Sequence, residues 1–364
     1  MSHDIEIIGD GCAAISLASR AGELNQKITL IRPSNAPPAK DHIWGFWSDP
    51  VLQNAQKLAA GTWNKWAVIT NDNCAVLTSE TRPYNAFRRS AWMKHCQHLA
   101  DAAGVKTINQ QDWQQSNTSL LFDTRPPVVP EGCMLQHFTG IEITTMDGKF
   151  DPDVAILMDF RVDQSEGMHF IYLLPFSETK ALVESTLFSL NTVSEQYYLS
   201  SIKSYLSQHY GIEDYVVEHQ ESGVIPLGKL APHDVSIPGL GANGGATRPA
   251  SGYAFLFIQR QIDEAIKAAN NGSRLRFKNP HRRIDLWMDS VFLTVLKHWP
   301  EHGPNMFLRM GKALSGDQFV KFLSGDAGLW IRLKVIFAMP KWPFIKALSK
   351  HVLTRQNTTS PVVA

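Results

Sequence analysis

The sequence has no uninterrupted apolar stretch of the roughly 18 to 20 residues that a helix needs to cross a bilayer. The longest candidate, residues 329–339, is interrupted by Arg332 and Lys334. The N-terminus, MSHDIEIIGDG, has neither a basic nor an apolar segment ahead of its first expected strand, so it lacks the pattern of a secretory signal. We therefore expect a cytoplasmic protein without a transmembrane helix.

The chain also has almost no net charge, +1 at pH 7, and no closely spaced cysteine pair. It carries 35 basic and 34 acidic side chains, which leaves no overall field to attract nucleic acid. The cysteines are scattered and form no CxxC pair, so neither a metal site nor a disulfide framework is indicated; they are Cys12, Cys74, Cys96 and Cys133. No protein partner is indicated either.

With 364 residues the chain is long enough for two lobes and a cleft between them. A short β-branched run at residues 5–8, a small apolar segment at 12–21 and a second apolar run at 27–31 predict a βαβ unit with a parallel sheet. Residues 36–66 are rich in proline and tryptophan and are expected to form an ordered loop. Residues 89–104 have helical spacing, and the turn-punctuated stretch 120–189 predicts successive antiparallel strands.

The remaining segments complete the predicted organisation. A glycine-rich turn at 239–245 leads into a helix over residues 252–270, and the chain is helical from 280 to about 350, followed by a polar, disordered tail at 356–360. We assign residues 1–120 and 236–275 to a dinucleotide-binding domain, 121–235 to an antiparallel substrate domain, and 276–364 to a helical C-terminal region.

The first chemical motif is a G-x-G-x-x-A turn formed by Gly9, Gly11 and Ala14 between the first strand and helix. Such a turn lets backbone N–H groups approach the pyrophosphate of a dinucleotide. The carboxylate that usually binds the ribose is missing, because Arg32 stands at the end of the second strand. Arg32 is compatible with a phosphate contact, a 2′-phosphate site or a solvent-facing side chain.

The second motif spans residues 241–253 and resembles the G-G-x-x-H-P-x-[ST]-G-Y segment of the lycopene cyclase family. The matching positions are Gly244, Gly245, Pro249, Ser251, Gly252 and Tyr253, whereas Arg248 replaces the usual histidine. Three further segments resemble the same family in the same order: residues 42–46 (H-I-W-G-F), 157–162 (L-M-D-F-R-V) and 182–186 (L-V-E-S-T).

The resemblance implies a two-lobed α/β flavoprotein with a Rossmann-like FAD-binding domain, an antiparallel-sheet substrate domain and a helical C-terminal part. It implies FAD that is active in its reduced form, with NAD(P)H as its reductant. The FAD contacts are expected at Gly9, Gly11, Ala14, Arg32, Gly244, Gly245, Pro249 and Gly252. The reaction implied is conversion of the linear ends of lycopene to β-rings without net oxidation.

Glu184 is the expected proton donor. In a strand it shares one face with Leu182 and Thr186, and apolar surroundings raise a carboxyl pKa. Ion pairing with a basic neighbour is the alternative. Ser185 replaces the second acidic residue of the family's E-E-T or E-D-T motif, so Asp159 is the candidate second carboxyl, with a capped turn as its alternative.

The lipophilic substrate directs attention to residues 329–346, which mix bulky apolar and basic residues with prolines. They are interpreted as an interfacial element at the membrane surface, or alternatively as a core helix with extended lysines. Two rivals to the cyclase remain: a flavin monooxygenase or isoprenoid reductase on the same fold, and a non-catalytic carotenoid-binding protein associated with membranes.

Overall fold

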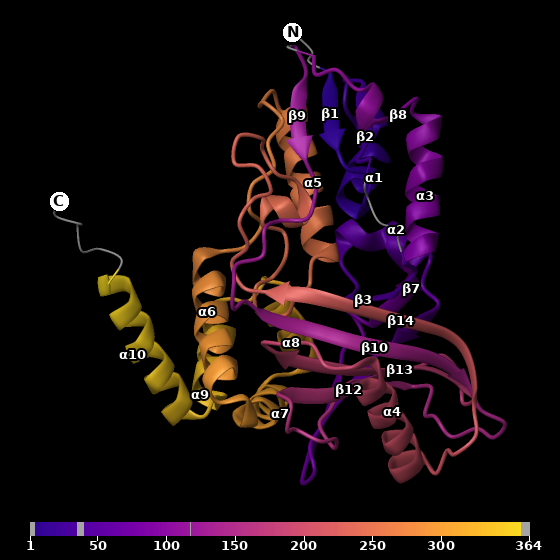
Figure 1. Cartoon of the computed structure of the whole chain (residues 1–364), viewed down its shortest axis with the longest axis vertical. Helices are drawn as coiled ribbons and strands as arrows, with labels where there is room; N and C mark the ends of the chain where they lie inside the picture. The colour runs from indigo at the N-terminus through magenta and orange to yellow at the C-terminus, as the bar shows by residue number, and fades with distance from the viewer. Residues whose placement is uncertain (1–3, 35–39, 117, 358–364) are drawn as a thin grey trace.

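The computed structural model describes residues 4–34, 40–116 and 118–357, with side chains described up to residue 350. A small parallel sheet occupies one end of the molecule, a wide and largely antiparallel sheet crosses the other, and the C-terminal helices lie beside the wide sheet (Figure 1). The expected fold class, a Rossmann-like lobe with an antiparallel sheet and a helical C-terminal part, is confirmed.

The parallel sheet contains the predicted βαβ unit. Its strands, in spatial order, are β8 (Lys106–Asn109), β2 (Ile28–Arg32), β1 (Ile5–Ile8) and β9 (Leu120–Asp123). The helices that pack around it are α1 (Cys12–Ala18), α3 (Arg89–Ala102) and α5 (Phe255–Asn270).

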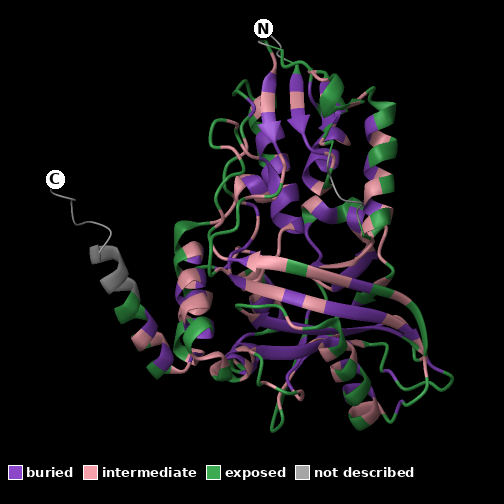
Figure 2. Cartoon of the chain, in the orientation of Figure 1, coloured by how far each residue is buried: buried purple, intermediate pink, exposed green. Residues whose placement is uncertain are grey.

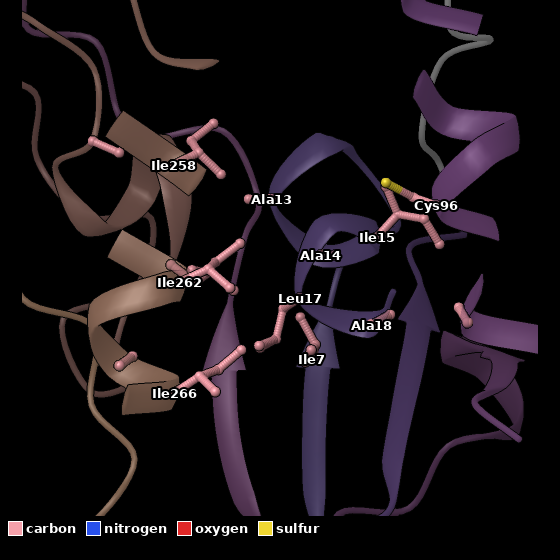
Figure 3. Close-up of a cluster of buried hydrophobic side chains, with 14 of the residues drawn as sticks. Ile7, Ala13, Ala14, Ile15, Leu17, Ala18, Cys96, Ile258, Ile262 and Ile266 are labelled. Atoms are coloured by element: carbon pink, nitrogen blue, oxygen red, sulfur yellow. The ribbon is translucent and has the colours of Figure 1, made fainter. Parts of the chain in front are cut away.

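Small side chains allow α1 to lie close to its neighbours. Figure 3 shows Ala13, Ala14 and Leu17 between the strands and the isoleucines of α5. A Cβ on Gly241 would lie 2.4 Å from the Cβ of Ala13, so this approach requires glycine there. The apolar contacts of α1 on both sides therefore fix the start of the chain against residues more than 220 positions later.

The wide sheet provides one wall of the site. Its strands, in spatial order, are β14 (Val216–Leu227), β10 (Met134–Thr144), β13 (Lys180–Ser189), β12 (Met168–Pro175), β11 (Val154–Asp159), β5 (Lys65–Ile69) and β6 (Cys74–Thr78). All neighbours are antiparallel except β11 and β5. Helix α4 (Glu195–Tyr210) packs on β10 and β13 and ends at Gly211, whose φ of 63° suits glycine.

Two expectations for local structure are wrong. Residues 36–66 are not simply a loop, because the described part contains β3 (Ile43–Trp47), α2 (Gln53–Gln56), β4 (Gly61–Trp63) and the start of β5. Strands β3 and β4 flank β7 (Tyr84–Arg88) in a small third sheet. In addition, the strand at 120–123 pairs in parallel with β1 and does not join the antiparallel sheet.

The C-terminal region is helical as predicted. Helices α6 (Arg283–His298), α7 (Gly303–Ala313), α8 (Gly316–Leu323), α9 (Leu329–Ala338) and α10 (Lys341–Asn357) follow one another. Ser315 and Gln318 form a capping box that begins α8. Among the described residues no helix is long and apolar enough to span a membrane. The expected disordered tail covered residues 356–360: residues 356 and 357 belong to α10 instead, and residues 358–360 lie outside the described part.

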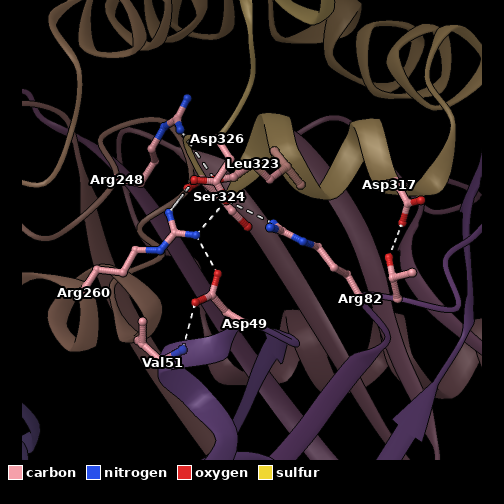
Figure 4. Close-up of polar contacts among 10 residues, drawn as sticks. Asp49, Val51, Arg82, Arg248, Arg260, Asp317, Leu323, Ser324 and Asp326 are labelled. Carbon is pink, nitrogen blue, oxygen red and sulfur yellow. Dashed lines mark hydrogen bonds and ion pairs between the residues drawn. The ribbon is translucent and has the colours of Figure 1, made fainter. Parts of the chain in front are cut away.

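Charged side chains join the C-terminal region to the rest of the molecule. Figure 4 shows the Arg260 guanidinium of α5 between Asp49 and Asp326, at 2.6 and 2.7 Å. Arg82 also pairs with Asp326, at 3.0 Å. Because Asp326 follows α8, this network holds the helices that cover the wide sheet against the lobe that contains α5.

Candidate active site

A cavity of about 940 Å³ lies between the two lobes and the C-terminal helices. Its wall begins at Cys12 in α1, follows β3, β12 and β13, and continues to Leu348 in α10. The lining is dominated by apolar and aromatic side chains. A single cavity thus connects the start of the βαβ unit with the most C-terminal helices.

Glu184 lines this cavity and is 8 % exposed. As its position in the strand predicted, it shares a face with Thr186, whose hydroxyl donates a hydrogen bond to Glu184 Oε1. Ser185 points to the opposite face, where it is hydrogen-bonded to His169. Burial, followed by the nearby Glu221 carboxyl, raises the pKa of Glu184 to about 8, so the group is a neutral acid at pH 7.

Aromatic rings stand next to this acid. Tyr172 is the direct partner of Glu184 on β12, and its hydroxyl lies 2.8 Å from that of Tyr84. A Cβ on Gly45 would lie 2.0 Å from the Tyr84 hydroxyl oxygen, so glycine leaves room for the tyrosine pair. Burial raises the pKa of both tyrosines well above the usual range, and they remain neutral. Trp44 and Trp47 of β3 complete this part of the wall.

Asp159 lies elsewhere. It is fully buried at the end of β11, where Arg161 binds both of its carboxylate oxygens and Tyr205 donates a hydrogen bond at 2.7 Å. It is absent from the cavity lining among the described residues. The structure therefore does not bring Asp159 and Glu184 together, and the ion pair satisfies the Asp159 carboxylate locally.

The N-terminal glycine turn has the shape expected of a phosphate-binding turn. Gly9 has a φ of 115°, and a Cβ there would lie 2.1 Å from Thr124 Oγ1. Gly11 precedes α1 and faces open space, beside a groove of about 570 Å³ that Asp10, Arg32 and Arg89 also line. Arg32 is half exposed and pairs with Asp10 at 2.7 Å, so its charge is partly neutralised before any ligand binds. Ala14 is fully buried behind the turn.

The second glycine segment divides into two parts. Gly244 is the last residue of the short 3₁₀ helix Gly241–Gly244, Gly245 caps it with a φ of 80°, and Pro249 is buried. Gly252, with a φ of 65°, lines the cavity together with Tyr253. The Tyr253 hydroxyl is buried and has no hydrogen-bond partner in the described part of the chain. This unpaired hydroxyl is available to donate a hydrogen bond to a polar ligand in the cavity.

Arg248 also lines the cavity, where it is held by Asp289 of α6. Its guanidinium donates two hydrogen bonds to the Asp289 carboxylate, at 2.7 and 3.0 Å, and both side chains are nearly inaccessible to solvent. The arginine that replaces the family's usual histidine is therefore half of a buried ion pair. It anchors the glycine segment to the C-terminal helices.

Several residues of this site were not predicted. Tyr84, Tyr172 and Glu221 come from β7, β12 and β14, and the sequence around each carries no motif. Glu221 is absent from the described cavity lining, but strand register places it beside Glu184, since Gly140 of β10 is opposite Glu184 on one side and Glu221 on the other. Only the pairing of the strands reveals this arrangement.

The fold and site define a flavoprotein-type α/β protein with an acid in the wall of an apolar cavity. A geranylgeranyl bacteriochlorophyll reductase-like protein from Thermoplasma acidophilum superposes with a TM-score of 0.57 at 14% identity, covering 96% of this chain and 99% of that one. A flavin-dependent brominase superposes with a TM-score of 0.61 at 13% identity, covering 97% and 100%. These similarities concern the fold.

The family follows from the sequence comparison. The family model described as "Lycopene cyclase protein" matches residues 4–349, and the chain belongs to this family. The lycopene beta-cyclase of Paracoccus sp. (strain N81106 / MBIC 01143) is 30% identical, with 98% of this chain and 100% of that protein covered. The lycopene beta-cyclase of Pantoea ananas is 22% identical, with 97% and 99% covered.

Proposed function

We propose that this protein is a lycopene β-cyclase that closes the linear ends of a carotenoid by acid/base chemistry. The observation that carries this proposal is the position of Glu184. This acid is neutral at pH 7 and stands in the wall of a cavity of about 940 Å³ lined mainly by apolar and aromatic side chains. Family membership and the two lycopene beta-cyclases among its relatives support the same substrate class.

Glu184 would donate its proton to the terminal C1=C2 double bond of the polyene. The resulting tertiary cation closes a six-membered ring, and the Glu184 carboxylate left by the first step takes the proton lost from C6, which gives the β-ring and restores the acid. One proton enters and one leaves, so substrate and product are isomers. The neutral rings of Tyr84, Tyr172, Trp44 and Trp47 exclude water and face the cation, each such contact contributing about 0.5 to 2 kcal/mol.

We propose FAD as the cofactor, because the residues present fit a dinucleotide. Gly11 opens onto the groove beside α1, Cys12 of α1 lines the cavity, and the Tyr253 hydroxyl in the cavity wall is an unpaired hydrogen-bond donor. Reduced flavin bound there would supply negative charge that stabilises the cationic intermediate. NAD(P)H would serve only as a source of electrons for the flavin.

We further propose that the protein binds to the membrane surface through α9 and α10. Trp330, Phe337 and Trp342 are 68 %, 72 % and 65 % exposed. The Lys346 ammonium lies 4.4 Å from the centre of the Trp342 ring, an arrangement suited to the boundary between lipid tails and anionic headgroups. Figure 1 shows α10 projecting away from the two sheets. Because α9 and α10 also line the cavity, a carotenoid would enter from the lipid beside them.

The Glu184→Gln variant tests the proposed acid. The amide keeps the size of the side chain and removes the transferable proton, so cyclisation at equal flavin occupancy should fall by about 10²- to 10⁴-fold. The control is Glu218→Gln, which removes an exposed carboxylate from β14 and should leave the rate unchanged. Near-normal turnover in the Glu184→Gln enzyme would remove this residue from the mechanism.

A further inference from the structure

Glu221 is a buried acid in a strand that is otherwise mostly open to solvent. Strand β14 lies at the edge of the wide sheet, and most of its residues are exposed or half-buried. Figure 2 shows this contrast with the buried inner strands. Glu221 is nevertheless only 3 % exposed. Burying a carboxyl at a sheet edge costs free energy unless other groups compensate it, so its surroundings need an explanation.

The strand register places Glu221 and Glu184 on the same face of the sheet. Gly140 pairs directly with Glu184 across β13 and with Glu221 across β14, and directly paired residues point to the same side. A Cβ on Gly140 would lie 3.3 Å from the Glu184 Cβ. Gly140 therefore contributes no side chain of its own between the two acids, which share this face of the sheet with Leu182.

The surroundings of the two carboxyls differ. Glu221 Oε2 accepts a hydrogen bond from the Ile43 backbone N–H at 2.9 Å, and Arg88 is near enough to lower its pKa. These contacts stabilise an ionised Glu221. The hydrogen bond that Glu184 receives comes from the Thr186 hydroxyl, which stabilises an anion less than a cation does.

Other titratable groups also face the pair. A carboxylate oxygen of Glu142 on β10 and a ring nitrogen of His219 on β14 each lie within 4.8 Å of a carboxylate oxygen of Glu221. Arg88 donates to Glu142 at 2.6 Å and thereby compensates the charge of that carboxylate. The loop before β3 contributes Asp41 and His42, and on the side toward Glu184 the titratable groups among the described residues are the neutral Tyr84 and Tyr172.

We propose that Glu221 is a positioning residue that ionises first and thereby keeps the proton on Glu184, an inference that rests on the proposed role of Glu184 as acid. A negative charge across Gly140 disfavours a second charge on Glu184. The pKa shifts agree with this order of ionisation. Burial raises the pKa of Glu221 only to about 7, whereas burial and then the Glu221 carboxyl raise the pKa of Glu184 to about 8. In this pair Glu221 carries the negative charge, and Glu184 keeps the proton that can be transferred.

The test follows the protonated carboxyl bands by infrared spectroscopy against pH, in flavin-loaded protein without substrate. The Glu184 band is the one missing in Glu184→Gln. In Glu221→Gln a negative charge is lost, so the Glu184 midpoint should fall by about one pH unit or more. The alkaline limb of cyclisation should move to lower pH by the same amount. Glu221→Asp keeps the charge and should restore the midpoint, and Glu218→Gln should leave it unchanged.

An unchanged Glu184 midpoint in Glu221→Gln would overturn this inference. If that variant fails to bind flavin, the wild-type protein decides: the first proton lost must belong to the band that remains in Glu184→Gln. Loss of the Glu184 proton first would equally overturn it. The titrations need no substrate, so absence of cyclised product from the wild-type enzyme would refute the proposed function and leave these results valid.

Discussion

Arg248 shows how the structure accommodates a residue that departs from a family motif. The segment resembles one in which histidine precedes the proline, and here an arginine extends past that position to pair with Asp289. The pair is buried on both sides, with side-chain exposures of 5 % and 6 %. A buried charge without its partner is costly, so each of these two residues depends on the other.

The Asp289→Ala variant should therefore lose about 3 to 5 kcal/mol of folding free energy, because it leaves the Arg248 guanidinium buried and unpaired. The matched control is Glu23→Ala, which breaks the more exposed pair with Arg20 and should cost less than about 1 kcal/mol. Denaturant unfolding of flavin-loaded protein measures both. Equal small losses would show that Arg248 does not need its partner.

The sequence indicated Glu184 as a candidate acid but did not indicate Glu221 beside it. The sequence indicates Glu184 because its segment resembles a family motif and because strand periodicity places it with Thr186 on one face. Glu221 stands in a polar run in which neither spacing nor composition marks it. Asp159 lies in a segment that resembles a family motif, but the motif does not show that Arg161 and Tyr205 bind its carboxylate.

At the scale of elements, the turn between β1 and α1 contains two glycines with different roles. Gly9 is required by the backbone, since its φ of 115° and the nearby Thr124 leave no room for a side chain. Gly11 faces open space, so a side chain there fits the protein but fills the groove. Substitutions at the two positions should therefore distinguish an effect on folding from an effect on the proposed ligand binding.

We expect Gly11→Leu to fold normally and to lose flavin, because the new side chain occupies the space proposed for the pyrophosphate. Gly9→Leu should lower the melting temperature, because it strains the backbone. Circular dichroism and the flavin absorbance of the purified protein separate the two effects. Full flavin occupancy in Gly11→Leu would mean that the pyrophosphate binds elsewhere.

Elements with a local signal were predicted well, and those that depend on distant partners were not. The βαβ unit, α3, α5 and the C-terminal helices follow from periodicity and glycine positions. The sequence predicts a loop where β3 and β4 lie, because their partner strand, β7, is outside that segment. Strand β9 was assigned to the wrong sheet, since its four residues indicate a strand but not which neighbour it pairs with.

The exposed aromatic residues of α9 and α10 yield a further prediction. Replacing Trp330, Phe337 and Trp342 by serine should weaken binding to liposomes containing anionic lipid by at least about tenfold, since burying each ring contributes on the order of 1.5 to 3 kcal/mol. The control replaces three exposed apolar residues elsewhere, Val76, Met146 and Val235. Equal binding of both triple variants in a sedimentation assay would exclude these helices as the contact.

At the scale of the whole molecule, one cavity connects the groove-bearing lobe to the exposed C-terminal helices. Its wall extends from Cys12 to Leu348, and the network of Arg260, Asp49 and Asp326 holds the two sides together. This arrangement suits a substrate that comes from lipid and a cofactor that comes from water. Under the proposed function, Glu184 would stand in the wall that both molecules share.

The central claim is that this molecule cyclises a carotenoid without net oxidation. The direct test is anaerobic incubation of the flavoprotein, reduced once, with lycopene in liposomes, followed by chromatography and mass spectrometry of the product. The account predicts many cyclised molecules for each reduced flavin, all with the mass of lycopene and without further NAD(P)H consumption. A product that gains hydrogen or oxygen, or one NAD(P)H consumed for each product, would contradict it.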